Sequence, residues 1–278
     1  MIAIFERKKQ NGGAFPLDID ALLSGMEAAA RSAGQIMLEA EDIRASATAK
    51  EGHGNFVTAY DSRIQAYLFE RLAALLPEAS FIGEEDGADA FPDEARRGYA
   101  FCVDPIDGTT NFLTGYRPSV TSIGLLHRGK PFLGVVYNPY QDMLFTGVRG
   151  GGARLNGKPI RSSDEPLSRS VVSFGTAPYH PEFAKETFAL CAGYLPRCID
   201  LRRAGVAAWD LCCVAMGTVG LFYEMELQLW DYAAGGLIAE EAGCRLTDMD
   251  GKPLPWDGPS SLLCASHSVA REDYFPIR

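Results

Sequence analysis

A nine-residue stretch near the middle of the chain constrains its fold and chemistry more than any other feature. It reads Asp104-Pro105-Ile106-Asp107-Gly108-Thr109-Thr110-Asn111-Phe112 and directly follows the apolar run 99–103. The run predicts a buried strand, and the Pro and Gly after it predict a tight turn that holds two carboxylates at a rigid corner. Hard divalent cations such as Mg²⁺ prefer carboxylate, carbonyl and water oxygens as ligands. The stretch therefore predicts a metal-binding corner suited to phosphoryl chemistry.

Several groups within this corner are candidates for that chemistry. Asp104 and Asp107 could bridge two ions, and Ile106 could add its backbone carbonyl. The backbone amides of Gly108 and Thr109 would face whatever anion the metals hold.

Three other acids occupy positions that suit either a structural or a functional role. Glu84 lies in an acidic turn after a short apolar run, Asp231 opens a predicted helix, and Asp61 stands at the start of another. Acids are common in turns and at helix N-termini, where a carboxylate accepts free backbone amides. Capping and metal ligation are not exclusive, so both stay open for Asp231. Taken alone, Asp61 is favoured as a cap and Lys50, in the loop before it, as a solvated side chain.

Two further motifs have more than one interpretation. Glu224 follows an apolar strand and could accept hydrogen bonds from a hydroxylated substrate. Segment 150–157 resembles a phosphate loop in its glycine content, but it lacks the Gly-Lys-Ser/Thr ending, so a β-hairpin is favoured. The four His residues show no metal-ligand spacing, which leaves Ser/His/Asp and Cys/His catalysis without local support.

Composition narrows the function classes. The chain has 278 residues, of which 47% are hydrophobic, enough for one large domain or two small ones. A net charge of −10 without a long run of Lys and Arg argues against nucleic-acid or membrane binding through a basic patch. No stretch approaches the roughly 18 apolar residues of a membrane span. Seven cysteines without a Cys-x-x-Cys pair predict reduced thiols and a cytoplasmic protein.

Hydrophobic periodicity predicts two halves after an irregular extension, residues 1–17. In the first half we expect helices at about 19–41 and 61–76, and an antiparallel meander of strands at 99–104, 120–127, 132–137 and 143–148. In the second half we expect strands at 170–174, 198–201, 219–223 and 245–247, and helices at 181–193, 206–216 and 232–242. The boundary falls where periodicity breaks near 155–168. It separates an α+β half, 18–160, which carries most metal ligands, from an α/β half, 161–278, which carries Asp231 and the substrate pocket.

Taken in order, these motifs resemble the inositol monophosphatase family. The resemblance rests on Gly83-Glu84-Glu85, on the 104–112 stretch and on Trp230-Asp231-Tyr232-Ala233-Ala234-Gly235, and it covers about residues 20–270. It implies a layered αβαβα sandwich of the sugar-phosphatase type, usually a homodimer. It also implies Mg²⁺-dependent hydrolysis of phosphate monoesters, often inhibited by Li⁺.

The resemblance assigns roles to single residues as well. It implies that Glu84, Asp104 and the Ile106 carbonyl hold one Mg²⁺, and that Asp104, Asp107 and Asp231 hold a second. Glu84 would also reach a weaker third ion.

The remaining roles concern the water, the phosphate and the loop over the site. Thr109, with Asp61 behind it, matches the pair that positions and activates the attacking water. The Gly108 and Thr109 amides match the phosphate cradle, and Lys50 matches a loop residue that closes over the site.

The substrate pocket is less closely specified. Gly205, Ala207 and Glu224 match the region that contacts the inositol ring, but Val206 and Trp209 replace residues that are usually smaller or hydroxylated, so we expect a reshaped pocket. The expected substrate is a small phosphorylated polyol or sugar, with inositol monophosphate first. Histidinol phosphate is the alternative, while fructose 1,6-bisphosphate and adenosine 3′,5′-bisphosphate are disfavoured. A metal-bound regulatory protein is the non-enzymatic alternative.

Overall fold

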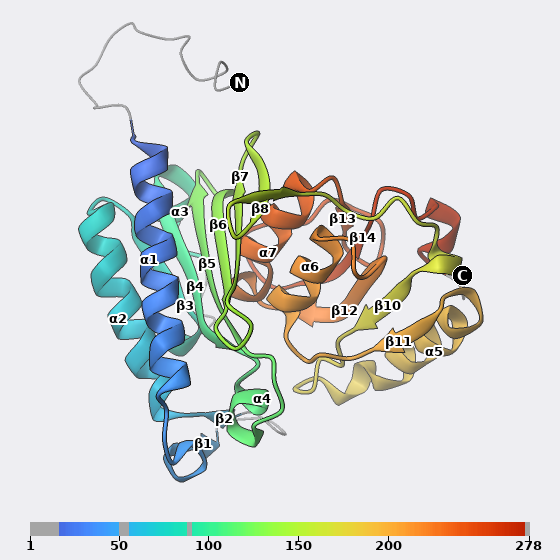
Figure 1. The fold of residues 1–278 in the computed structure, drawn as a ribbon, viewed down its shortest axis with the longest axis horizontal. Coiled ribbons are helices and arrows are strands. Elements are labelled where there is room, and N and C mark those ends of the chain that lie inside the picture. The colour runs from blue at the N-terminus through green and yellow to red at the C-terminus, as the bar shows by residue number, and fades with distance from the viewer. Residues whose placement is uncertain (1–16, 50–55, 88–90, 276–278) are drawn as a thin grey trace, which may run out of the picture.

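The computed structural model describes residues 17–49, 56–87 and 91–275 of the chain. Its elements stack in five layers, as Figure 1 shows, and this confirms the predicted αβαβα sandwich. The layers are helices α1 (Ile19–Leu38) and α2 (Ala59–Leu75), a seven-stranded sheet, helices α6 (Ala207–Ala215) and α7 (Leu229–Glu241), a five-stranded sheet, and helix α5 (Ala184–Tyr194). The extension predicted for residues 1–17 lies, apart from Leu17, outside the described residues.

The seven-stranded sheet confirms the predicted meander. Its strands pair in the order of the chain, antiparallel throughout except that β3 runs parallel to β4. They are β3 (Ser80–Gly83), β4 (Tyr99–Asp107), β5 (Val120–His127), β6 (Lys130–Asn138), β7 (Met143–Val148), β8 (Gly152–Leu155) and β9 (Lys158–Ile160).

The five-stranded sheet has the order β11-β10-β12-β14-β13 and mixed direction. Strand β10 runs parallel to β11 and β12, whereas β14 is antiparallel to β12 and β13. The strands are β10 (Val171–Phe174), β11 (Asp200–Arg202), β12 (Leu221–Leu227), β13 (Arg245–Thr247) and β14 (Ser260–Ala265). We did not predict β14, although it is a central strand of this sheet. The boundary expected near residue 160 falls between the last strand of the first sheet and β10.

Helix α7 lies between the two sheets and is buried along most of its length. It approaches the first sheet so closely that a Cβ on Gly134 would lie 2.8 Å from the Ala234 carbonyl oxygen. Glycine in β6 therefore allows the contact between layers. The outer helices α1 and α2 cover the other face of the first sheet, and α5 covers the outer face of the second.

The glycine-rich segment forms the β7–β8 hairpin, as predicted. The amides of Gly150 and Gly152 donate to the two carboxylate oxygens of Glu241 at 2.9 Å and 3.0 Å. Both glycines have positive φ, a conformation that glycine adopts without strain. The loop that resembled a phosphate site thus already binds an anion, a carboxylate at the end of α7.

Several element ends differ from the predictions. Helix α1 ends at Leu38 rather than near residue 41, and α2 begins at Ala59, two residues earlier than predicted. Helix α7 likewise begins at Leu229 instead of residue 232. A short helix, α4 (Thr109–Thr114), was not predicted, because six residues between two glycines are too few to show a helical period.

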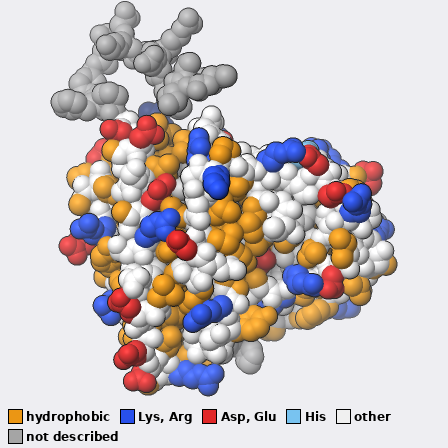
Figure 2. Space-filling view, viewed as in Figure 1, with side chains coloured by type: hydrophobic (Ala, Val, Ile, Leu, Met, Phe, Trp, Pro, Cys, Tyr) orange, Lys and Arg blue, Asp and Glu red, His pale blue; other side chains and the backbone are white. Residues whose placement is uncertain are grey.

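The surface agrees with the charge argument from the sequence. On the face in Figure 2, Lys and Arg side chains are scattered singly among acids and apolar side chains. Within the described residues, no helix combines the length and hydropathy needed to cross a bilayer.

Candidate active site

The acidic corner is built by a bulge in strand β4. The pairing of β4 with β5 shifts register between Asp104 and Asp107, across Pro105, which has no amide proton to contribute. We expected the strand to end at Asp104, but it continues to Asp107. The bulge keeps both acids on a buried strand: Asp104 is 2% exposed and Asp107 7%.

A cavity of about 420 Å³ lies against this corner, close to the N-terminal ends of α6 and α7. Ten residues predicted for the site line it together: Glu84, Asp104, Ile106, Asp107, Gly108, Thr109, Gly205, Ala207, Glu224 and Asp231. Asp61 does not line the cavity and lies behind Thr109. Lys50 lies outside the described residues.

The carboxylates at the inner end of the cavity repel one another. Burial, and then the charges of Glu84, Asp107 and Asp231, hold the pKa of Asp104 well above its usual range. Burial, followed by the charge of Asp231, does the same to the pKa of Asp107. Burial also raises the pKa of Asp231 to about 7. Such a cluster is costly to ionise unless a cation joins it.

The donor set fits a hard divalent cation. All the side-chain donors at this end are carboxylates, and the buried Oδ1 atom of Asp104 has no hydrogen-bond partner. Among the described residues that line the cavity, Arg203 is the only Lys or Arg. Within the described residues, no three His, Cys, Asp or Glu side chains are already placed as a bound metal would require, so an ion could be held there only after the carboxylates change rotamer.

Thr109 and Asp61 form the predicted pair. The Thr109 Oγ1 atom lies 3.0 Å from Asp61 Oδ1 and 3.1 Å from the Ile106 carbonyl oxygen. The other carboxylate oxygen of Asp61 accepts the Thr58 amide at 2.8 Å and the Thr58 hydroxyl at 2.6 Å. Asp61 is thus the third residue of α2 in a capping box with Thr58 as N-cap, and it contacts Thr109 as well.

The two halves of the chain meet at the carboxylates. Asp107 Oδ2 accepts the amide of Ala208, in the first turn of α6, at 2.6 Å. Asp231 Oδ2 accepts the Gln228 amide at 2.7 Å. We expected Asp231 as the N-cap of its helix, but Gln228 is the N-cap and Asp231 the third residue of α7.

Glu224 lies inside β12 rather than after a strand, which corrects the prediction, because β12 continues through Leu227. Its Oε1 atom accepts the amide of Ala177 at 2.9 Å, and burial raises its pKa to about 7. A Cβ on Gly175 would overlap the Glu224 carboxyl group at 1.9 Å. The Glu224 carboxylate therefore fixes the loop after β10 through its hydrogen bond with the Ala177 amide.

Neither Val206 nor Trp209 lines the cavity, so any effect of theirs on its shape would pass through the residues they pack against. Val206 is 2% exposed and packs beneath Gly108, where a Cβ would lie 2.6 Å from its Cγ2 atom. Trp209 packs edge to face on Phe145, with ring centroids 6.0 Å apart.

Sequence reasoning missed the residues that form the cavity's outer wall. Tyr179, His180 and Arg203 all line it, and they come from two loops of the second half. His180 lies between two acids, with Nδ1 3.1 Å from Glu182 Oε1 and Nε2 3.2 Å from Glu226 Oε1. No local motif marks these residues, since the folding of the loops alone brings them to the carboxylates.

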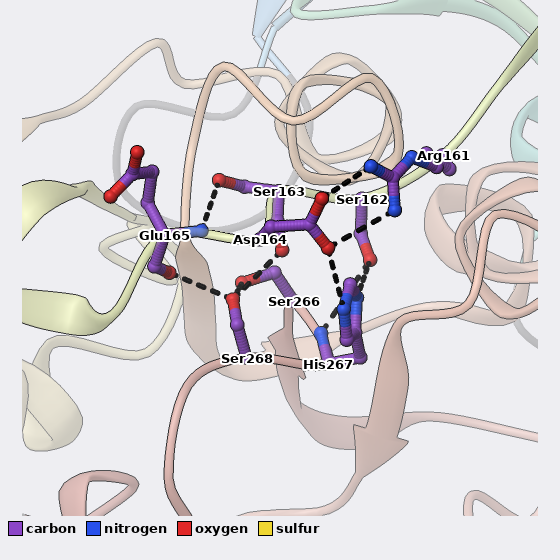
Figure 3. Close-up of polar contacts among 8 residues, drawn as sticks. All are labelled: Arg161, Ser162, Ser163, Asp164, Glu165, Ser266, His267 and Ser268. Atoms are coloured by element: carbon purple, nitrogen blue, oxygen red, sulfur yellow. Dashed lines mark hydrogen bonds and ion pairs between the residues drawn. The ribbon is translucent and has the colours of Figure 1, made fainter.

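A second polar cluster, outside the cavity, connects the segment after β9 with the segment after β14 (Figure 3). His267 Nδ1 lies 3.0 Å from Ser162 Oγ, and its Nε2 lies 3.0 Å from Asp164 Oδ1. This order of Asp, His and Ser matches a hydrolytic triad. Ser162 is only 1% exposed, however, and does not line the cavity, so it is closed to a substrate. The cluster is a structural clasp.

The chain resembles known proteins over almost its whole length. The model of the inositol monophosphatase family matches residues 18–277. A putative Nus factor SuhB of Neisseria meningitidis serogroup B is 36% identical, covering 87% of this chain and 92% of that protein. Inositol monophosphatase 3 of Solanum lycopersicum is also 36% identical, covering 87% of this chain and 89% of that protein.

Solved structures agree with these relatives. The extragenic suppressor protein SuhB of Bartonella henselae superposes with a TM-score of 0.79 at 31% identity, covering 89% of this chain and 95% of that one. The structure of SaIMPase-II with bound inositol monophosphate has a TM-score of 0.75 at 25% identity, covering 92% and 93%.

Proposed function

Because the chain belongs to the inositol monophosphatase family, we propose that it hydrolyses a small phosphate monoester with Mg²⁺-activated water. One observation carries the proposal: Glu84, Asp104, Asp107 and Asp231 converge on a single cavity that also contains Thr109. Acids from two separated halves meet there although each raises the cost of ionising the others. A fold gains nothing from such a cluster unless cations bind it.

The metal ligands proposed are those that the resemblance implied. Glu84, Asp104 and the Ile106 carbonyl would hold one Mg²⁺, and Asp104, Asp107 and Asp231 a second, with Glu84 near a weaker third. When bound, the ions lower the pKa of coordinated water and neutralise charge on the phosphoryl oxygens. The orphaned Oδ1 atom of Asp104 supports its role as the shared ligand.

The chain's own residues position the water and the phosphate. The Thr109 hydroxyl donates a hydrogen bond to Asp61 Oδ1, 3.0 Å away, which leaves its oxygen free to accept a hydrogen bond from the attacking water. The Asp61 carboxylate thereby fixes the orientation of that hydroxyl. The amides of Gly108 and Thr109, at the turn into α4, are the proposed donors to the phosphate.

The proposed substrate is inositol monophosphate, and histidinol phosphate is the nearest alternative. Gly205, Ala207 and Glu224 line the end of the cavity assigned to the leaving group. The Glu224 carboxylate could accept hydrogen bonds from ring hydroxyl groups, and the small residues Gly205 and Ala207 leave space for the ring. The inositol monophosphate seen in SaIMPase-II supports this order of candidates.

A second candidate function is that of a metal-bound regulatory protein. Relatives at 34–36% identity are named Nus factor SuhB, and that name favours a role in binding other macromolecules. The sequence argued against nucleic acid as a direct partner, and we keep that prediction. A homodimer in the cytoplasm is proposed for either function, and the seven free cysteines support a reducing compartment.

The test is phosphate release from four esters, with Mg²⁺ and with a chelator, at near-neutral pH. The panel contains inositol 1-phosphate, histidinol phosphate, fructose 1,6-bisphosphate and adenosine 3′,5′-bisphosphate. Metal-dependent turnover led by inositol 1-phosphate is the expected result. Metal binding without turnover on any ester would instead support the regulatory function.

A further inference from the structure

The loop after β10 carries a tyrosine that no role above uses. Tyr179 lines the same cavity as the carboxylates, and 47% of its surface is exposed. Its hydroxyl makes no hydrogen bond to another described residue. A phenol is both a donor and an acceptor, so Tyr179 brings an unused donor to the mouth of the cavity.

Tyr179 shares the cavity with the carboxylates and feels their charge. Burial, and then the charges of Glu84, Asp231, Asp104 and Asp107, raise the pKa of Tyr179. These four acids are the proposed metal ligands, whereas Glu224 belongs to the leaving-group end. The phenol therefore stays protonated at neutral pH and can act as a donor within the cavity that these acids line.

The backbone around Tyr179 is held on both sides. Ala177 has a φ of +40°, a strained conformation for a residue other than glycine, and its amide donates to Glu224 at 2.9 Å. The His180 amide donates to the Ala177 carbonyl at 2.8 Å, and the His180 ring lies between Glu182 and Glu226. Tyr179 is thus fixed between two anchors rather than placed on a free loop.

We propose that Tyr179 is a substrate-contacting residue whose hydroxyl donates a hydrogen bond to a phosphoryl oxygen on the open side of the cavity. The inference rests on the proposed phosphatase function. Carboxylates with their metals and the backbone amides of Gly108 and Thr109 would hold the phosphate from the inner side. An anion is the natural acceptor for a neutral phenol, and the hydrogen bond is strong because the acceptor is charged.

The test compares Tyr179→Phe, which removes only the hydroxyl, with wild type and with the control Tyr116→Phe. Tyr116 is 64% exposed and does not line the cavity. The measurements are kcat/KM for inositol 1-phosphate and for histidinol phosphate, and inhibition by inorganic phosphate. We expect Tyr179→Phe to lower both kcat/KM values by a similar factor, about 10- to 100-fold, and to weaken phosphate inhibition. The control should match wild type.

Two results would overturn the inference. The first is a Tyr179→Phe enzyme within twofold of wild type on both esters. The second is a loss confined to one ester with phosphate inhibition unchanged, which would place the hydroxyl on the leaving group.

Failure of the proposed function would look different, because wild type itself would show no metal-dependent turnover. Calorimetric titration with inorganic phosphate in Mg²⁺ then decides the role of Tyr179. Phosphate binding at least about tenfold weaker in Tyr179→Phe supports the contact, and equal affinities refute it.

Discussion

The two walls of the cavity are built in different ways. The first half supplies Asp104 and Asp107 from one bulged strand and Thr109 from the turn after it, so three functional groups sit within six residues. The second half supplies Glu224 from the interior of strand β12 and Tyr179 from the loop after β10. In that loop, Ala177 has a left-handed backbone conformation, and its amide donates to Glu224. The part of the inner wall from Asp104 to Thr109 owes its geometry to one short segment, whereas Asp231 and the outer wall reach the cavity through long-range contacts.

The groups proposed for catalysis and the groups proposed to select the substrate therefore lie in different parts of the cavity. Asp104 and Asp107, two of the proposed ligands, come from one strand, where a single bulge sets their positions. The groups assigned to the leaving-group end come from the second half: Glu224 from β12, Ala207 from the start of α6 and Gly205 from the loop before it. We therefore expect changes in the inner wall to abolish turnover, and changes at the leaving-group end, where Glu224 lies, to alter which ester is preferred.

The largest effect is expected at Asp104. Asp104→Asn should lower turnover by at least about a thousandfold, because it removes the shared ligand of two ions. In chelator at pH 7.5 the same variant should melt at a higher temperature than wild type, since burial and three neighbouring acids make its charge costly. Thermal unfolding and phosphate release measure the two effects.

The matched control is Glu78→Gln, which changes an exposed acid outside the cavity. It should leave both quantities as in wild type. An Asp104→Asn protein that turns over normally with Mg²⁺ would show that the inner wall does not hold the metals.

The next effect in size is expected at Thr109. Thr109→Ala should lower kcat by about 100- to 1000-fold, in the range of general acid–base contributions, because the attacking water loses its orienting hydroxyl. Thr109→Ser keeps the hydroxyl near Asp61 and should retain activity within about tenfold. Equal activity in the Thr109→Ala and Thr109→Ser variants would show that the Thr109 hydroxyl has no part in the mechanism. Steady-state kinetics with saturating Mg²⁺ makes the comparison.

A smaller, pH-dependent effect is expected at Glu224. Burial raises its pKa in the folded protein to about 7, above its ordinary value of 4.5. The folded state therefore binds this proton more tightly than the unfolded state, and the stability it contributes is lost as pH rises from about 4.5 to about 7. The Glu224→Gln variant carries no such charge and should gain about 1–3 kcal/mol over wild type between pH 5 and pH 8.

Denaturant unfolding in chelator at several pH values measures this difference. Subtracting the two unfolding free energies at each pH cancels the titration of acids that the Glu224 charge does not reach; Asp107, Asp210 and Asp231 lie within its reach. A difference that does not change with pH would mean that the Glu224 carboxyl has the same pKa in the folded and the unfolded protein.

The smallest effect is expected at the cluster of Ser162, Asp164 and His267, which lies outside the cavity and has no proposed part in the reaction. His267→Ala should cost no more than about 1 kcal/mol of stability, because the pair with Asp164 is exposed. Turnover should stay within twofold of wild type. A large loss of turnover would contradict the view that Asp164, His267 and Ser162 are structural.

The inner wall could be predicted from sequence because its signal is local. The 104–112 stretch carries two ligands, a glycine turn and a hydroxyl within nine residues, and the meander around it alternates in clear runs. The residue types at the helix N-termini were also predictable, but the position of Asp231 was wrong: it is the third residue of α7 and not its N-cap. A carboxylate accepts amides from the N-cap or from the third helical position, and composition alone does not distinguish the two.

The outer wall could not be predicted because no local signal marks it. Tyr179 and His180 sit between two prolines in a loop, and their contact with the carboxylates depends on how β10 and β12 pair. Val206 was expected in the pocket from its position beside Gly205, yet it faces Gly108 instead. Side-chain direction in a turn follows from backbone angles, which neighbouring residue types do not specify.

The most direct test of the account is a metal titration of the chelator-treated wild-type protein with inositol 1-phosphate as substrate. We predict no phosphate release without metal and full recovery on addition of Mg²⁺, with a dependence on Mg²⁺ concentration steeper than one ion allows. Phosphate release that persists in chelator would contradict the account, because the acids at the end of β4 would then have no metal to hold.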